Sequence, residues 1–139
     1  MDDIPDRMAR AVNGLLNRYL VRGADGEARA LPYNPVDYQT LRFVADGERR
    51  ATDVARHLGV APTTMQSALD RLVRRGLLDK RRSDADGRAR LYCLTEEGGR
   101  VHGAIEAQDR ANMAAMLAPL APKDRERLAD LLDAVVRGG

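Results

Sequence analysis

The chain has 139 residues, enough for one domain with a hydrophobic core but little more. Hydrophobic residues make up 44% and charged residues 32% of the sequence, which excludes a disordered or membrane-embedded chain by composition. The acidic N-terminus argues against a secretory signal, and no stretch reaches the ~18 consecutive apolar residues of a membrane span. We therefore expect a cytoplasmic protein that folds as a single domain over residues 1–139.

The net charge of +2 is unevenly distributed along the chain. Residues 71–90 contain eight basic and three acidic side chains and carry a charge of +5, so the remaining residues sum to −3. Such a local excess favours an anionic partner, although a solvated charged face would have the same composition. The single cysteine, Cys93, excludes an internal disulfide, and two histidines are too few for a Cys/His metal cage. We predict no metal site and no cofactor.

The N-terminal third predicts two helices with a connector between them. Apolar residues recur three or four positions apart from Ile4 to Leu20, which is the spacing of one helical face. The stretch 23–33 contains two glycines, a proline and alternating charges, which is typical of a connector. Asn34 and Pro35 then supply an N-cap and a first-turn proline, so a second helix is expected from there to about residue 45.

Two closely spaced helices are predicted next. The first spans about residues 52–58 and ends at Gly59, a residue type that tolerates positive φ. The second begins at Pro62 and continues to about residue 75. Its expected buried stripe consists of Met65, Ala68, Leu69, Leu72 and Val73, which leaves a polar face on the opposite side. Two helices joined by so tight a turn are the pattern of a helix-turn-helix.

A hairpin and a further helix are expected after this pair. Two short strands joined by a Gly-containing turn fit the charged segment and the apolar run that follows it, with Tyr92 and Leu94 on one face and Leu91 and Cys93 on the other. Thr95 would then cap a helix that runs to about residue 118. A basic hairpin directly after a helix-turn-helix forms the wing of a winged helix.

The segment 53–98, DVARHLGVAPTTMQSALDRLVRRGLLDKRRSDADGRARLYCLTEEG, resembles the helix-turn-helix and wing of the MarR family of transcription regulators. Asp86 and Arg88 match that family's Asp-x-Arg in the wing, and the run from Leu94 to Gly98 matches its Leu-Thr-x-x-Gly. Ala61 departs from the pattern, because the family usually has a capping Ser or Asp there. The connector at 23–33 is also longer than expected.

The resemblance implies a mainly α fold of the α+β class, a winged helix-turn-helix with a two-stranded wing, flanked by N- and C-terminal dimerisation helices. We expect the winged core over residues 34–95 and the dimerisation region over 4–22 and 96–137. The resemblance also implies DNA binding as a symmetric dimer, usually as a repressor.

The apolar pattern of the chain ends supports the same assembly. A last helix opening at Pro122 is expected to carry a stripe formed by Leu128, Leu131, Leu132, Val135 and Val136. A compact winged domain cannot cover both this stripe and that of the first helix, so a second copy should do so. A two-fold dimer would set two recognition helices ~34 Å apart on a pseudo-palindromic site.

The residues expected to touch DNA follow from groove geometry. The major groove is ~12 Å wide and admits one helix, whose N-terminal side chains meet base edges. The predicted base readers are therefore Thr63, Gln66 and Ser67. Gln66 could bond adenine through both its donor and its acceptor. Thr64 and the helix N-terminus favour a phosphate.

The arginines that follow are expected to bind the DNA backbone. Those predicted to hold phosphates are Arg71, Arg74, Arg75 and Arg82, with Arg90 completing the basic set. Arg88 lies at the wing tip, where it is placed to enter the adjacent minor groove; a solvated turn arginine is the alternative.

Other classes of function fit the sequence less well. No phosphate-binding glycine loop, HExxH pair or GxSxG elbow has a suitable context, so we predict no catalytic residues and no enzyme activity. A winged helix that binds protein instead of DNA remains the alternative, although it would not need so basic a face. Cys93 could be a redox sensor or an ordinary strand cysteine.

A small-molecule effector is suggested by the family resemblance, and the sequence does not identify it. The expected site is the junction between the terminal helices and the winged domain. Its candidate polar residues are Tyr33, Tyr38 and His102.

Overall fold

The computed structural model describes residues 3–21, 34–85 and 87–139, and of residues 19–21 it describes the backbone only. It contains two compact units. The central unit consists of Leu31–Ala107, and the terminal unit consists of Met1–Ala30 and Gln108–Gly139. The connector predicted at 23–33 lies outside the described residues.

Helix α2 (Pro35–Ala45) opens the described part of the central unit, with the cap that the sequence predicts. The Asn34 side chain accepts a hydrogen bond from the backbone N–H of Asp37 at 2.9 Å, and Pro35 occupies the first turn. Because proline has no N–H to leave unbonded and its φ already suits a helix, this start is stable locally. The helix ends just before Gly47.

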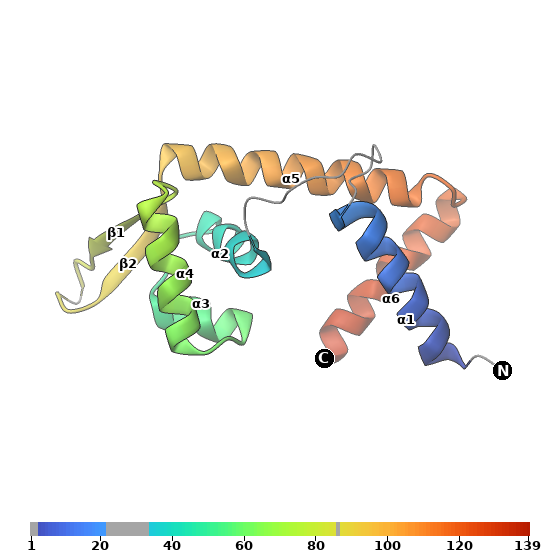
Figure 1. Cartoon of the computed structure of the whole chain (residues 1–139), viewed down its shortest axis with the longest axis horizontal. Helices are drawn as coiled ribbons and strands as arrows, with labels where there is room; N and C mark the ends of the chain where they lie inside the picture. Colours follow the sequence, from blue (N-terminus) through green and yellow to red (C-terminus); the bar gives the residue numbers. More distant parts are fainter. Residues whose placement is uncertain (1–2, 22–33, 86) are drawn as a thin grey trace. The chain divides into compact units, whose positions relative to one another are not determined.

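Helices α3 (Ala51–Leu58) and α4 (Pro62–Arg74) form the predicted helix-turn-helix, which can be followed in Figure 1. Gly59 terminates α3 with φ of 68°, a left-handed conformation in which a side chain would be strained. Its N–H bonds the carbonyl of Arg56. Gly76, with φ of 77°, ends the α4 segment in the same way and turns the chain into the hairpin.

The core of the central unit lies where α2, α3 and α4 meet the base of the hairpin. Four of the five residues expected on the buried stripe of α4 are fully buried, and the fifth, Val73, packs against the core while partly exposed. The buried apolar cluster consists of Leu41, Val44, Val54, Ala55, Met65, Ala68, Leu69, Leu72, Leu77, Leu78 and Tyr92. Val101 and Ile105 of α5 (Glu96–Leu117) pack against it.

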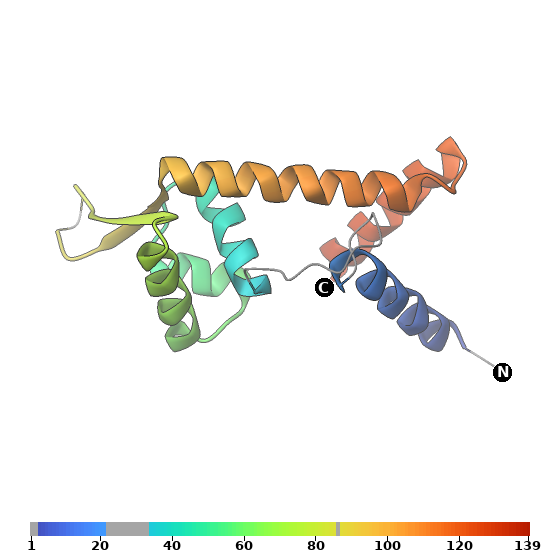
Figure 2. The same ribbon diagram turned by 45° about the horizontal axis from the view of Figure 1, so that its top comes forward.

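Strands β1 (Leu78–Arg82) and β2 (Arg90–Leu94) pair antiparallel, with Leu78 opposite Leu94 and Arg82 opposite Arg90. Tyr92 is buried, as the predicted strand faces require. The hairpin extends away from α4 as a two-stranded arm, which both views show (Figures 1 and 2). Its base is also held by an isolated bridge, in which Arg49 and Tyr92 exchange backbone hydrogen bonds of 3.0 and 2.8 Å.

The start of α5 is bonded tightly to the end of the α4 segment. Thr95 caps the helix as predicted, since its Oγ1 accepts from the N–H of Gly98 at 2.9 Å while donating to the carbonyl of Gly76 at 2.6 Å. A Cβ on Gly98 would lie 2.0 Å from the carbonyl oxygen of Leu77. Only glycine permits this close approach of two backbones.

The terminal unit contains α1 (Ile4–Leu15), the end of α5, and α6 (Pro122–Gly138). The predicted first helix forms, but from Leu16 to Val21 it continues as a π-helix, a change that periodicity did not indicate. Arg125 of α6 donates from Nε to the carbonyls of Leu117 and Leu120, at 3.0 and 2.9 Å, and so satisfies the free end of α5.

Apolar side chains of the terminal unit remain exposed. Ile4 is 76% exposed and Val136 is 78% exposed. In the described part of this unit no apolar residue is buried; its buried residue is polar, Asn112, which accepts from Gln108 Nε2 at 3.0 Å. The apolar stripes of α1 and α6 therefore have no buried apolar residue beneath them in the described part of this unit. None of the helices among the described residues is long and apolar enough to span a membrane.

Candidate nucleic-acid interface

The solvent face of α4 carries the four residues expected near its N-terminus. Burial of Met65, Ala68, Leu69 and Leu72 turns the opposite side of the helix outward. The exposed side chains on that side are Thr63, Thr64, Gln66 and Ser67. Ala61, at the N-cap, makes no side-chain capping bond, so this helix start lacks the cap that Ser or Asp would supply.

The Gln66 amide is held by two partners that the sequence did not indicate. Its Nε2 donates to Asp70 Oδ1 at 3.0 Å and to the Tyr92 hydroxyl at 3.2 Å. Asp70 lies one turn along α4, whereas Tyr92 comes from β2 and is only 2% exposed. The bond between Gln66 and Tyr92 therefore connects the solvent face of α4 to the core side of the hairpin.

Arg71, predicted to hold a phosphate, is bonded to a buried carboxylate. Its Nε and Nη2 donate to the two carboxylate oxygens of Asp37, at 3.3 and 2.6 Å, and Asp37 is 1% exposed. The hydrogen bond to Asp37 raises the pKa of Arg71 above its ordinary value. This bidentate pair joins α4 to α2 and leaves the two hydrogens of Nη1 and the second hydrogen of Nη2 for any phosphate contact by Arg71.

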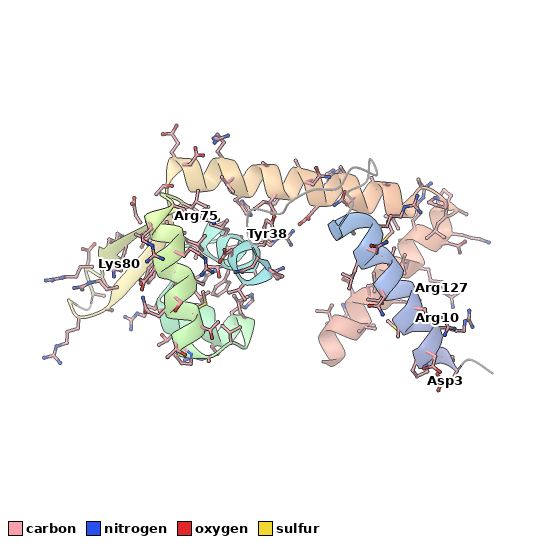
Figure 3. All side chains as sticks on the ribbon, viewed as in Figure 1. Asp3, Arg10, Tyr38, Arg75, Lys80 and Arg127 are labelled. Atoms are coloured by element: carbon pink, nitrogen blue, oxygen red, sulfur yellow. The ribbon has the colours of Figure 1, made fainter. Side chains whose placement is uncertain are left out.

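Arg74 and Arg75 are exposed at the C-terminal end of the α4 segment, as expected for residues that would meet a DNA backbone. Figure 3 labels Arg75 at this end of the helix and Lys80 on the adjoining hairpin. Arg75 also interacts with another group of the protein.

One face of the hairpin changes from apolar at its base to basic toward its tip. Because residues paired across antiparallel strands share a face, the register groups Leu78, Tyr92 and Leu94 with Lys80, Arg82 and Arg90. The three apolar residues pack on the core, and the three cations are exposed. Lys80 was missed in the sequence-based prediction, although strict alternation with Arg82 would have placed it there.

Arg81 points to the opposite face and is bonded elsewhere. Its Nε donates to Glu48 Oε1 at 2.6 Å, and its Nη2 bonds the other carboxylate oxygen. This hydrogen bond lowers the pKa of Glu48 and raises the pKa of Arg81. Arg81 is therefore a hairpin cation tied to the α2–α3 loop, distinct from the three on the other face.

Arg49 anchors the same loop. Its guanidinium lies 4.1 Å from the centroid of the Phe43 ring, and its Nε donates to the Phe43 carbonyl at 3.2 Å. His57 stacks on that ring with a centroid distance of 3.9 Å. Since both groups lie about 4 Å from one centroid, they occupy opposite faces of the ring. His57 is thus an exposed residue that packs on the Phe43 ring.

Residues 83–89 connect the two strands of the hairpin. Ser83 is buried, and its N–H donates to the carbonyl of Ala89 at 3.0 Å. Arg88 is exposed and has a partner within the structure. Asp86, the other residue of the Asp-x-Arg match, lies outside the described residues.

The environment of Cys93 argues against a reactive thiol. Burial raises its pKa, and the charges of Asp79 and Glu48 raise it further. Reactive thiols need a depressed pKa, so the strand position of this cysteine favours packing over sensing. Among the residues that the structure describes, no group of three His, Cys, Asp or Glu side chains could hold a metal ion.

The predicted effector residues are described only in part. Tyr33 lies outside the described residues. Tyr38 is half-buried on α2, where Figure 3 labels it. His102, on α5, lies with Nε2 3.3 Å from Glu106 Oε1. Both described residues belong to the central unit.

Comparison with known proteins gives a consistent set of relatives. A sequence model of the MarR family matches residues 31–89. The PcaV transcriptional regulator from Streptomyces coelicolor, solved in complex with its natural ligand, is 30% identical with a TM-score of 0.66. That match covers 96% of this chain and 89% of PcaV. Among curated proteins, none matches the chain.

Two further solved structures share the fold at lower identity. A probable transcriptional regulator from Pseudomonas aeruginosa is 24% identical, with a TM-score of 0.73, and the match covers 96% of this chain and 99% of that one. BpsR from Bordetella bronchiseptica, whose DNA binding is regulated by 6-hydroxynicotinic acid, is 19% identical with a TM-score of 0.73. That match covers 97% of this chain and 94% of BpsR.

Proposed function

Because this chain belongs to the MarR family of transcription regulators, we propose that it acts as a homodimeric repressor that binds a specific site on double-stranded DNA. The observation that carries the proposal is the alignment of polar and basic groups in the central unit. The exposed polar start of α4 is bonded through Gln66 to the hairpin face on which Lys80, Arg82 and Arg90 are exposed. A helix that enters the major groove beside a basic hairpin that contacts the backbone is one arrangement that binds duplex DNA. We also propose that the protein is located in the cytoplasm, as the sequence analysis predicts.

Each predicted contact residue takes a role in this proposal. Thr63, Gln66 and Ser67 read base edges, and Thr64 contacts a phosphate at the start of α4. The backbone is held by Arg74, Arg75, Arg82 and Arg90, to which we add Lys80. Arg88 enters the minor groove from the wing tip. Arg71 chiefly holds α4 against α2 through Asp37, and its Nη1 supplies the predicted phosphate contact.

The proposal of a dimer is supported by the exposed apolar stripes of the terminal unit. Leu131, Leu132, Val135 and Val136 are exposed on α6, and α1 carries a second exposed stripe. Leaving a large apolar side chain in water forgoes roughly 1.5–3 kcal/mol of burial free energy. A two-fold partner covers such stripes with the same surface of a second copy, and it would present two α4 helices to a pseudo-palindromic site.

We extend the proposal to a small-molecule effector. PcaV was solved with its natural ligand, and we extend ligand response to this chain on that likeness. Tyr38 and His102 are the described candidates for polar contacts, with Tyr33 as the third. Aromatic-acid and other small-molecule libraries can be screened by thermal shift, with Tyr38→Phe and His102→Gln as variants that should weaken any hit.

The DNA proposal is tested by the salt dependence of binding to selected genomic fragments. Two protomers that each neutralise a few phosphates should give a log-log slope of roughly −5 to −9 in fluorescence anisotropy. Arg82→Ala should flatten the slope by about one to two, since a dimer loses two contacts. The matched control is Arg81→Ala, which removes the same charge from the opposite face and should leave the slope unchanged. Failure to bind any duplex at low salt would favour a winged helix that binds protein instead.

A further inference from the structure

On the solvent face of α4, the Gln66 side-chain amide is held by two hydrogen bonds within the protein. A glutamine has two N–H donors and one carbonyl acceptor, and a free one can turn either end toward a ligand. Here Nε2 lies within hydrogen-bond distance of two partners at once, Asp70 Oδ1 and the Tyr92 hydroxyl. Both of its hydrogens are therefore used inside the protein.

The chemistry of Asp70 determines which end of the amide faces inward. An ionised carboxylate only accepts hydrogen bonds, so it attracts the NH2 group and repels the amide carbonyl. The Tyr92 hydroxyl accepts the second hydrogen. Turning the amide over would place its oxygen against the Asp70 carboxylate, so that the bond to Asp70 would be replaced by repulsion, while the Tyr92 hydroxyl could only exchange accepting for donating. Oε1 is consequently the end presented to solvent, and among the described residues it has no hydrogen-bond partner.

Tyr92 makes this orientation rigid. Its side chain belongs to the core cluster, and its backbone pairs with Lys80 in the sheet and with Arg49 in the isolated bridge. The hydroxyl therefore cannot follow a moving glutamine. A side chain held in its binding orientation before contact loses less conformational entropy on binding, so a preorganised acceptor discriminates more sharply than a free one.

We propose that Gln66 reads a single exocyclic amine in the major groove through Oε1, and that Asp70 and Tyr92 are positioning residues for this acceptor. The inference rests on the proposed function, since it requires α4 to enter the groove. In the major groove, adenine N6 and cytosine N4 are donors, whereas guanine and thymine present acceptors at the corresponding edge. The preferred base is therefore adenine or cytosine, with guanine and thymine rejected.

This differs from the two-bond adenine contact that glutamine commonly makes. That contact needs an Nε2 hydrogen for adenine N7, and supplying one would break a bond to Asp70 or Tyr92. The two modes are separable with modified bases at the position where Gln66→Ala relaxes the preference. Purine removes the N6 amine, and 7-deazaadenine removes only the N7 acceptor.

The parent protein is titrated with these duplexes by fluorescence anisotropy. We expect purine to weaken binding about tenfold, the effect of one lost directional contact, and 7-deazaadenine to change it less than about twofold. At a cytosine position, 2-pyrimidinone replaces purine as the base that lacks the amine. A loss with 7-deazaadenine as large as that with purine would overturn the inference, as would a preference for guanine or thymine.

The positioning residues are tested with Asp70→Asn and Tyr92→Phe. The first replaces the carboxylate with an amide that can donate to Oε1, and so allows the Gln66 amide to turn over. The second keeps the ring in the core and removes the hydroxyl. Each variant should reduce the amine preference from about tenfold to about twofold and leave affinity for random duplex unchanged. A purely structural role would weaken all duplexes equally and leave the ratio intact, which overturns the assignment.

Asp79→Asn is the matched control, because it makes the same substitution at an exposed residue of β1 that pairs with Cys93 on the hairpin face opposite Tyr92. It should leave the preference at the Gln66 position intact. If Asp70→Asn proves unfolded by circular dichroism, Tyr92→Phe and the modified-base duplexes still decide the matter. Absence of binding to any duplex overturns the proposed function together with this inference, whereas specific binding without the amine preference overturns the inference alone.

Discussion

The central and terminal units contain similar helices but bury their apolar side chains very differently. In the central unit, the stripes of α2, α3 and α4 meet each other and the base of the hairpin, so that residues such as Leu41, Leu69 and Leu72 are fully buried. In the terminal unit, α1 and α6 present stripes of the same kind to solvent. An amphipathic sequence therefore indicates that the apolar face of a helix packs against another surface. It does not indicate whether that surface belongs to the same chain or to a second copy.

This difference separates two sources of stability. The central unit gains its hydrophobic free energy within one chain, and hence at any dilution. In the proposed dimer the terminal unit gains its hydrophobic free energy by association, which depends on protein concentration. Experiments that change one unit at a time should distinguish the two.

The largest effect is expected from charges placed on the α6 stripe. Leu131→Asp together with Val135→Asp should weaken dimerisation at least about a hundredfold, since each residue forgoes roughly 1.5–3 kcal/mol of burial. Specific DNA affinity should fall with it, although no DNA-facing residue is altered. Sedimentation equilibrium gives the mass, for which the monomer value is 15.3 kDa.

Asp130→Asn, on the same helix but off the stripe, serves as the control and should remain dimeric. A parent protein that keeps the monomer mass at micromolar concentration would contradict the association of the terminal units.

The second-largest effect is expected on the stability of the central unit, from a substitution in its buried core. Leu69→Ala should lower the free energy of unfolding by about 2–5 kcal/mol, because it leaves a cavity in a fully buried site. Urea denaturation followed by circular dichroism measures the loss. The cost of Leu131→Ala should disappear on dilution below the dimer dissociation constant. If the two substitutions responded alike to dilution, the distinction between the units would be wrong.

A smaller loss is expected when the bond between α2 and α4 is cut. Arg71→Ala leaves the buried Asp37 carboxylate without its cation and should cost about 1–3 kcal/mol, less than a fully buried pair because Arg71 is 34% exposed on its side chain. Arg74→Ala, exposed on the same helix, should stay within about 0.5 kcal/mol of the parent. Equal losses in urea denaturation would mean that the Asp37 pair contributes nothing.

The smallest effect is expected from the exposed ion pair between Arg81 and Glu48 in the central unit. Arg81 lowers the pKa of Glu48, so the pair stabilises the fold above the ordinary carboxyl value of 4.5 and is lost only as pH falls through a lower folded value. An NMR titration of the Glu48 side chain should show its midpoint below 4.5. Arg81→Gln should return that midpoint to the ordinary range, and an unchanged midpoint would exclude Arg81 as the cause.

Local signals in the sequence predicted much of this fold. Asn34 with Pro35, Gly59 and Thr95 marked helix boundaries correctly, because caps and positive φ depend on the adjacent backbone. The two strands of the wing were predicted from the alternation of side chains between the two faces of a strand. The π-helix after Leu15 was not predicted, since an apolar spacing of three or four residues does not distinguish it from an α-helix over so short a segment.

The contacts of the candidate interface were the harder part to predict. Gln66 and Tyr92 are 26 residues apart, and Asp37 and Arg71 are 34 apart. Such pairs depend on how α4 packs against the hairpin and α2, which no local pattern encodes. The sequence could therefore place Gln66 and Arg71 on the polar side of a helix, but it could not show which of their nitrogens were already used.

The register of the hairpin has a consequence for how its length can vary. Tyr92, inserted in the core, sets which side chains of β1 and β2 share its face. One residue added within either strand would move the cations beyond it to the opposite side, because side chains alternate. An insertion in the turn at 83–89 leaves the strand pairing intact. Natural variation, or an engineered peptide tag, should thus be tolerated at the tip and rejected a few residues away.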